Sequence, residues 1–235
     1  LMIRRPPRST QGVSSAASDV YKRQAFMRLI ETKETQDQMN SASALKELKD
    51  GNQRFVEKKQ LNHDLIKQVL ETSTGQFPFA NILSCIDSRV SSELIFDQGI
   101  GDIFSVRIAG NFVNEDILGS MEFACKLAGT KLVLVLGHTA CGAVKGACDH
   151  ARLGNLTTLL NKIEPSVEAV KEPEDVSLRN SSNIDFVNEV AAVNVKMTIE
   201  NIRVKSQVLK ELEDAGEIQI IGGMYDIKTG AVEIY

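Results

Sequence analysis

Tryptophan is absent from the 235-residue chain, aromatic residues make up only 5% of it, and it has three histidines and four cysteines. With few rings to stack on bases and a net charge of −4, the chain lacks the features of a nucleic-acid-binding protein. No apolar run reaches the ~18 to 20 residues that span a bilayer, so we expect no membrane segment. Four cysteines are too few for a disulfide framework at this length, which favours a reducing compartment and predicts a cytoplasmic protein.

Charge is distributed unevenly along the chain. Residues 1–30 contain six basic residues and one acidic residue, Asp19, which gives +5, so the remaining residues carry −9 to reach the total of −4. Three interpretations of this segment compete: an organellar targeting peptide, a native basic arm, or non-native sequence, since residues 14–24 resemble translated sequencing-adapter sequence. We favour the third. Residues 1–24 are then a non-native or disordered tail that packs against nothing, and residues 25–235 form a single domain.

Short apolar runs alternate with helical patterns through that domain. The runs do not alternate with polar residues, which is typical of a parallel sheet buried on both faces. The last two runs are joined by a short turn, so the final strand should be an antiparallel edge. The predicted fold class is α/β: a central, mostly parallel sheet of four strands plus an antiparallel edge strand, helices on both faces, and a long N-terminal helix. Strands are predicted at residues 79–84, 103–107, 131–136, 218–222 and 231–234. Helical patterns cover residues 43–60, 61–70, 116–128, 142–150, 156–170 and 184–203. A short helix through Phe96 is capped by Ser91 or Ser92, and a last helix is capped by Ser206 and ended by Gly216.

Two of the predicted strands end on residues that bind metals. Cys85 directly follows the run at 79–84, and His138 and Cys141 follow the run at 131–136. In open α/β sheets the chemistry lies at the carboxyl ends of the strands. Two sulfurs and one imidazole nitrogen suit zinc, and three protein ligands leave a fourth position open for chemistry.

Each of these residues also has an ordinary structural interpretation. A free cysteine is commonly a small buried hydrophobe, and a lone histidine is more often structural than a ligand. The spacing His138-x-x-Cys141 is a short motif that occurs often by chance. Their convergence at two strand ends of one sheet nevertheless favours a zinc site.

The residues around the three ligands resemble a known family. The segments Cys85-Ile86-Asp87-Ser88-Arg89 and His138-Thr139-Ala140-Cys141-Gly142 closely resemble the β-class carbonic anhydrases, in their bacterial, plant-like branch. The resemblance extends over roughly residues 40–235. It includes the segments 44–55, 107–111, 119–124 and 222–230.

This resemblance implies one Zn²⁺ per subunit, held by Cys85, His138 and Cys141, and reversible hydration of CO2 to bicarbonate and a proton by zinc-bound hydroxide. Two thiolates donate more charge to zinc than imidazoles would, which makes the bound water harder to ionise. Asp87 is expected to offset this by accepting a hydrogen bond at the metal. Arg89 is placed to hold that carboxylate.

Asp87 has an alternative role in this family, in which it becomes the fourth zinc ligand and closes the site. In members that close, an aromatic residue stands three positions before the first cysteine. Ile82 occupies that position here. We therefore expect the open state to dominate.

The resemblance also assigns a substrate cleft. Gln76 is expected to donate a hydrogen bond to the substrate oxygen. The walls are expected to be Phe104, Ala109, Phe123 and Gly142, with Phe123 contributed by a neighbouring subunit, although core packing is an equal alternative for the two phenylalanines. The expected partners are thus CO2 or bicarbonate and further copies of the chain, as a homodimer or a tetramer.

Other notable residues receive structural interpretations. We expect Arg107 to order a loop or interface, and Cys125 and Cys148 to be core thiols. His150 is more simply an exposed residue at a helix end than a proton relay, and His63 is expected on the surface. Two competing functions stay open: a non-catalytic zinc protein closed by Asp87, and an enzyme acting on a related small molecule such as carbon disulfide.

Overall fold

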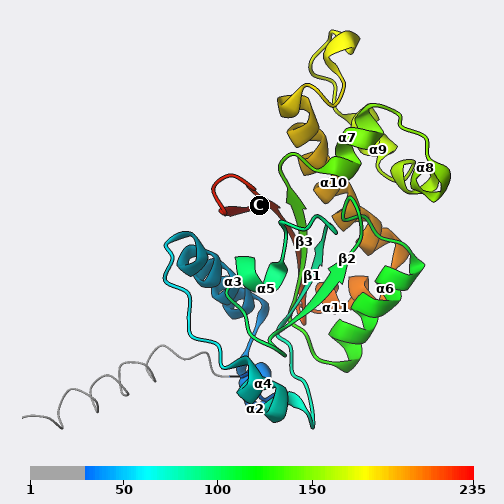
Figure 1. Cartoon of the computed structure of the whole chain (residues 1–235). Coiled ribbons are helices and arrows are strands. Elements are labelled where there is room, and N and C mark those ends of the chain that lie inside the picture. The colour runs from blue at the N-terminus through cyan, green and yellow to red at the C-terminus, as the bar shows by residue number, and fades with distance from the viewer. Residues whose placement is uncertain (1–29) are drawn as a thin grey trace, which may run out of the picture.

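The computed structural model describes residues 30–235 of the chain (Figure 1). The predicted tail at residues 1–24 lies outside the described residues. Along the chain come α2 (Lys33–Gln38), α3 (Ser41–Val56), α4 (Leu65–Thr72), β1 (Ala80–Ser84), α5 (Ser92–Ile95), β2 (Ile103–Arg107), α6 (Glu115–Glu122), the π-helical η1 (Phe123–Leu127), β3 (Leu132–His138), α7 (Gly142–Cys148), α8 (Gly154–Leu160), α9 (Glu164–Ala169), the short 3-10 helix η2 (Val176–Leu178), α10 (Ile184–Lys205), α11 (Gln207–Asp214), β4 (Gln219–Tyr225) and β5 (Val232–Ile234).

One five-stranded sheet, in the order β2-β1-β3-β4-β5, organises the fold. The first four strands are parallel, and β5 runs antiparallel to β4 at the edge. All residues of β1 and β3 are buried because these strands are central and covered on both faces. The predicted fold class is therefore confirmed.

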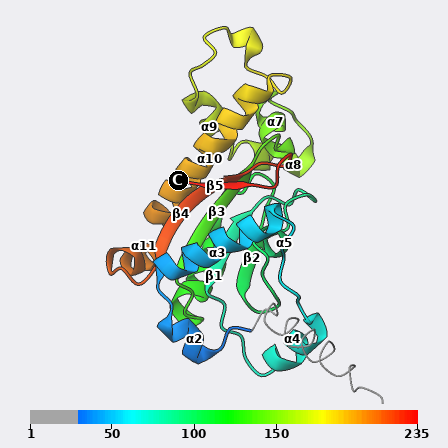
Figure 2. The same cartoon turned by 90° about the vertical axis from the view of Figure 1, so that its left-hand side faces the viewer.

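Helices cover both faces of this sheet (Figures 1 and 2). Consecutive strand residues point to opposite faces, so Ile82 packs with the residues beneath α3 and α5, whereas Leu83 packs with those beneath α6, α10 and α11. A third apolar cluster lies beyond the carboxyl ends of the strands and contains Cys85, Cys141 and residues of α7, α9 and α10. Among the described residues, no helix has the length and apolar character needed to cross a bilayer.

Some helix boundaries differ from the sequence-based prediction. The pattern at 156–170 is two helices, α8 and α9, because Pro165 lies in the first turn of α9 and cannot continue a preceding helix. The pattern at 116–128 changes from α to π geometry at Phe123. Ser91 occupies the N-cap of α5 but makes no capping hydrogen bond, whereas Ser206 accepts one from the backbone N–H of Leu209, as predicted.

His63 is not the surface residue that the sequence suggested. Its Nε2 lies 3.0 Å from a carboxylate oxygen of the buried Asp97, and its side chain is largely covered. Asp97 also accepts hydrogen bonds from Nε of Arg54 at 2.6 Å and from the backbone N–H of Leu61 at 3.1 Å. The linker between α3 and α4 is thus fastened to the end of α5. No local pattern indicates this contact, because the partners are distant along the chain.

Candidate metal centre

The carboxyl ends of β1 and β3 carry the three proposed metal ligands. These strands are parallel neighbours, with Ser84 opposite Leu136. Cys85 directly follows β1, and His138 is the last residue of β3. Cys141 is the N-cap of α7, three residues beyond His138, after a turn in which Ala140 has a left-handed φ of +55°. The sheet register therefore brings together residues that are 56 positions apart.

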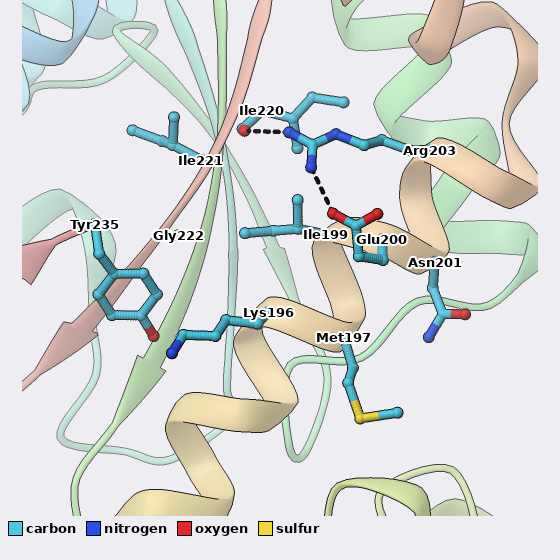
Figure 3. Close-up of a pocket in the computed structure, with 10 residues that line it drawn as sticks. All are labelled: Lys196, Met197, Ile199, Glu200, Asn201, Arg203, Ile220, Ile221, Gly222 and Tyr235. Atoms are coloured by element: carbon cyan, nitrogen blue, oxygen red, sulfur yellow. Dashed lines mark hydrogen bonds and ion pairs between the residues drawn. The ribbon is translucent and has the colours of Figure 1, made fainter. Parts of the chain in front are cut away.

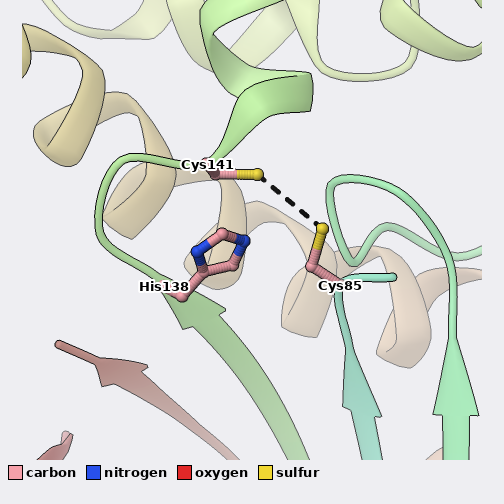
Figure 4. A group of neighbouring side chains, drawn as sticks. All are labelled: Cys85, His138 and Cys141. Atoms are coloured by element: carbon pink, nitrogen blue, oxygen red, sulfur yellow. Dashed lines mark hydrogen bonds between the residues drawn. The ribbon is translucent and has the colours of Figure 1, made fainter. Parts of the chain in front are cut away.

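The three side chains converge on one point (Figure 4). Their ligand atoms all lie within 4.8 Å of one another, and the two Sγ atoms are 3.9 Å apart. Two sulfurs bound to one tetrahedral zinc at ~2.3 Å each would be separated by about 3.8 Å. The spacing already present in the chain therefore fits zinc without rearrangement.

The imidazole of His138 is oriented for metal binding. Its Nδ1 lies 3.0 Å from the carbonyl oxygen of Thr139, to which it donates in the neutral ring. This tautomer leaves the lone pair on Nε2. That atom is buried and has no hydrogen-bond partner within residues 30–235. A buried nitrogen lone pair beside two thiols is what a zinc ion would satisfy.

The pKa values of the two thiols are shifted in opposite directions. The pKa of Cys85 is lowered to about 4, first because Cys141 donates a hydrogen bond to its sulfur, and further through the backbone N–H groups of Gly110 and Asp87. The pKa of Cys141 is raised because its proton is held by Cys85 and because it is buried. A metal cation that binds both sulfurs would displace the proton of Cys141.

Asp87 faces Arg89 rather than the three ligands. Arg89 donates from Nε to Oδ1 at 2.8 Å and from Nη2 to Oδ2 at 2.7 Å, and its backbone N–H donates to Oδ1 at 3.0 Å. These bonds hold the pKa of Asp87 well below its usual range. Oδ2 remains 4.0 Å from Nε2 of His138, so the carboxylate borders the site as an ionised acceptor.

Arg107 anchors the segment that carries Cys85 and Asp87. Its Nε donates to the carbonyl oxygen of Cys85 at 3.0 Å, and its Nη2 donates to that of Asp87 at 2.7 Å. The predicted loop-ordering role of Arg107 is thus what the structure shows. This guanidinium fixes the direction in which the chain leaves β1.

Two of the predicted cleft residues, Ala109 and Gly142, lie next to the metal ligands of their own chain, and the two phenylalanines do not. Ala109 precedes Gly110, whose N–H donates to Sγ of Cys85 at 3.4 Å, and Gly142 follows Cys141 with open space where a side chain would be. Phe104 and Phe123 instead line a hollow beside the edge strand β2, with ring centroids 6.3 Å apart. This hollow runs along β2 from Phe104 to Arg107, and none of the three metal ligands lines it.

Gln76 is also not brought to the metal centre by its own chain. It is exposed in the segment before β1, at the amino end of the strand, whereas Cys85 follows the carboxyl end. A strand separates the two residues. Gln76 and the metal ligands therefore lie at opposite ends of β1.

The remaining cysteines and His150 fit their structural interpretations. Burial raises the pKa of Cys125 to about 12 and that of Cys148 to about 11, so both thiols stay protonated. His150 is exposed, 3.6 Å from the carboxylate of Glu164. None of the three is directed at the metal centre.

A separate hollow lies between α10 and β4 (Figure 3). Arg203 donates there to Glu200 at 2.6 Å and to the carbonyl oxygen of Ile220 at 3.3 Å, and the ammonium of Lys196 lies 5.6 Å from the ring centre of Tyr235. Burial raises the pKa of Tyr235 to about 12. Its charged groups already have partners, and none of the predicted site residues lines it.

Residues that support the ligands from α10 were missed in the sequence. Asn188 accepts a hydrogen bond from the N–H of Ala140 at 2.8 Å, and Asn194 donates to the carbonyl oxygen of Gly110 at 2.8 Å. Both asparagines lie within an amphipathic helical pattern that gives no indication of a polar role. The one sequence signal of such a supporting role is a polar residue on the buried face of a helical pattern, as at Asn194.

Comparisons with known proteins agree with the geometry. Residues 80–232 match the family model described as carbonic anhydrase. The chain is 34% identical to a carbonic anhydrase of Mycolicibacterium smegmatis, over 83% of this chain and 93% of the relative. It is 35% identical to carbonic anhydrase 2 of Mycobacterium tuberculosis, over 81% and 91%. The solved β-carbonic anhydrase CafA of Aspergillus fumigatus superposes with a TM-score of 0.64 at 27% identity, covering 83% of this chain and 89% of that one.

Proposed function

The chain belongs to the β-carbonic anhydrase family, and we propose from this premise that it catalyses the reversible hydration of CO2 to bicarbonate and a proton at a zinc ion held by Cys85, His138 and Cys141. The observation that carries the proposal is the convergence of two thiols and one unpartnered imidazole nitrogen within 4.8 Å at the carboxyl ends of adjacent parallel strands, among the described residues. Bound there, zinc would lower the pKa of water from ~15.7 towards neutrality and so supply hydroxide at working pH.

The chain's own residues would prepare the fourth position. Asp87 stays ionised because Arg89 holds it in a bidentate contact, and it borders the ligands as a hydrogen-bond acceptor for the reacting water. Gly142 leaves space on the other side of Cys141 through which a small molecule could approach. These features favour an open site over one closed by Asp87, and hence an enzyme over a non-catalytic zinc protein.

We further propose that the functional unit contains at least two copies of the chain. Phe104, Phe123 and Gln76 lie away from the metal centre of their own chain. The side chain of Phe123 is 50% exposed and lies beside the edge strand β2, where a second copy could cover it. On this arrangement, each subunit would supply the apolar wall and the amide donor for its neighbour's site.

Zinc content and CO2 hydration, measured together from neutral to mildly alkaline pH, test the function. The full chain is expected to bind one zinc and to hydrate CO2 faster as pH rises, because deprotonated water is the nucleophile. Cys141→Ser should lose zinc and activity, whereas Cys148→Ser, which alters a buried thiol seven positions away, should keep both. Zinc bound by the full chain without hydration at any pH would contradict the enzymatic proposal.

A further inference from the structure

Two loops at the metal centre are fastened to α10. The loop after β2 touches Cys85 through Gly110, and the loop after β3 joins His138 to Cys141. Nδ2 of Asn194 donates to the carbonyl oxygen of Gly110 at 2.8 Å. Six residues earlier on the same helix, Oδ1 of Asn188 accepts from the N–H of Ala140 at 2.8 Å. A single rigid helix therefore sets the relative position of both loops.

Gly110 connects Asn194 to a ligand sulfur. Its N–H donates to Sγ of Cys85 at 3.4 Å, while its carbonyl group is held by Asn194. Its φ is +78°, and a Cβ there would lie 2.4 Å from Cδ1 of Ile163, so only glycine fits without displacement. With both of its backbone groups bonded, this residue has little freedom to move relative to the sulfur.

Asn194 is itself held in one orientation. Its side chain is 3% exposed, and Oγ of the buried Ser166, in α9, lies 3.3 Å from Oδ1 as a donor. A hydroxyl that donates to Oδ1 leaves Nδ2 facing Gly110. The chain Ser166–Asn194–Gly110–Cys85 thus runs through buried groups from α9 to the metal centre.

Asn188 stabilises a backbone conformation that is costly by itself. Ala140 has a φ of +55°, in the left-handed region that residues with a Cβ seldom adopt. That conformation sets how Cys141 turns back towards His138. The hydrogen bond from the N–H of Ala140 to Asn188 is a contact that favours it.

We propose that Asn188 and Asn194 are positioning residues of the metal centre: Asn194 directs the Gly110 N–H at the Cys85 sulfur, and Asn188 sets the spacing of His138 and Cys141. An N–H bond to a ligating sulfur withdraws charge from it, and groups that orient metal ligands typically change metal affinity by ~10- to 100-fold. The proposal deepens the proposed function because it concerns the same site. Its principal test is metal binding, which does not depend on CO2 hydration.

Asn188 acts as a hydrogen-bond acceptor and Asn194 as a donor, so substitution by aspartate is expected to affect the two positions differently. Asn188 is an acceptor, so Asn188→Asp retains the required oxygen, whereas Asn188→Ala does not. Asn194 is a donor to Gly110, so neither Asn194→Asp nor Asn194→Ala retains the bond. Asn201→Ala is a matched control, because Asn201 is on the same helix at the hollow of Figure 3, away from both loops.

The measurements are the dissociation constant for Co²⁺, by competition with a coloured chelator, and the cobalt–thiolate absorption of the loaded protein. Asn188→Ala, Asn194→Ala and Asn194→Asp should weaken binding ~10- to 100-fold and shift the absorption. Asn188→Asp and Asn201→Ala should match the wild type. Ser166→Ala removes the hydroxyl that holds the Asn194 amide, with little loss of volume, and should weaken Co²⁺ binding less than the Asn194 variants. It tests the role of Asn194 if the Asn194 variants do not fold.

Unchanged affinity and absorption in Asn188→Ala and Ser166→Ala would overturn the proposal, as would Asn188→Asp behaving like Asn188→Ala. A full chain that binds cobalt with the expected ranking of variants, yet hydrates no CO2 when loaded with zinc, would contradict the proposed function and leave the positioning roles standing.

Discussion

The contact between Asp87 and Arg89 controls which group faces the fourth position of the metal centre. Three hydrogen bonds from Arg89 occupy the carboxylate of Asp87. Because Arg89 lowers the pKa of Asp87, ionisation of this carboxylate stabilises the fold above the unfolded value of ~3.9, and the contribution is lost only as pH falls towards the lower folded value. Asp87 therefore stays charged at neutral pH, and the pH dependence of activity should come from water.

We expect Arg89→Ala to lower CO2 hydration by ~10- to 100-fold, because the freed carboxylate loses its orientation or turns towards the metal. Stopped-flow hydration and zinc analysis on the same samples measure this. Arg152→Ala is the control, since Arg152 pairs with Glu164 on the surface instead. Loss of zinc from Arg89→Ala would show that Arg89 supports metal binding itself rather than the orientation of Asp87.

Asn81 is a buried polar residue of β1 whose side chain lacks a hydrogen-bond partner among the described residues. Its side chain is 1% exposed, and neither amide atom has a hydrogen-bond partner in the part of the chain that the structure describes. It packs beside Phe104 in the neighbouring strand. An unpaired buried polar group costs ~1–3 kcal/mol.

Asn81→Leu, which has a similar volume and no polar atom, should therefore raise the free energy of unfolding by ~1–3 kcal/mol. Chemical denaturation measures this, and Asn81→Asp should have the opposite effect because it buries a charge. Destabilisation by leucine would indicate that water or a neighbouring chain satisfies the amide.

At the scale of elements, Asp97 joins three of them. This buried carboxylate binds Arg54 of α3 and both Leu61 and His63 of the following linker, directly after α5. Its φ of +50° is in the left-handed region, which asparagine and aspartate tolerate better than other residues with a side chain. Aspartate therefore suits position 97 for two reasons: it tolerates the left-handed backbone conformation, and it carries the charge that Arg54 pairs with.

Asp97→Asn keeps that backbone preference but removes the charge, so it should reduce the free energy of unfolding by ~1.5–3 kcal/mol, the scale of charge-assisted hydrogen bonds. Urea denaturation provides the measurement. Asp175→Asn is the comparison, because the Asp175 carboxylate accepts hydrogen bonds from Ser177 near the surface and its replacement should have little effect. Equal effects of the two substitutions would contradict the role assigned to Asp97.

At the scale of the whole molecule, the exposed apolar residues of η1 lie beside the unpaired edge of β2. Leu127 is 75% exposed and Phe123 is 50% exposed. An edge strand next to exposed apolar side chains favours association. A second copy on this face would complete the sheet edge and cover both residues.

Phe123→Glu and Leu127→Glu are therefore expected to convert the oligomer to monomers and to lower activity together with the oligomeric fraction. Sedimentation velocity and hydration assays over a range of protein concentrations measure both. Val176→Glu, in η2 between α9 and α10, is the control, because Val176 is as exposed as Leu127 but lies in a different part of the chain. A monomeric wild type with full activity would refute the shared site.

Local sequence patterns are sufficient to specify the sheet, the directions of its strands and the three convergent ligands. Continuous apolar runs at β1 and β3 require burial on both faces, and a short turn before β5 requires an antiparallel edge. Cys85 and His138 follow from that topology, because adjacent parallel strands bring their carboxyl ends together. These are local signals, since each depends on residues close together in the chain.

The surroundings of the ligands, in contrast, are set by tertiary contacts. The direction of Asp87, the anchoring by Arg107 and the two asparagines of α10 depend on contacts between segments about 20 to 84 positions apart or on one of several side-chain rotamers. The same holds for His63 against Asp97, and for Gln76 and Phe123, which lie away from their own metal centre. Sequence periodicity shows which face of an element is buried, but not which polar group it meets there, because the relative placement of distant elements fixes those contacts.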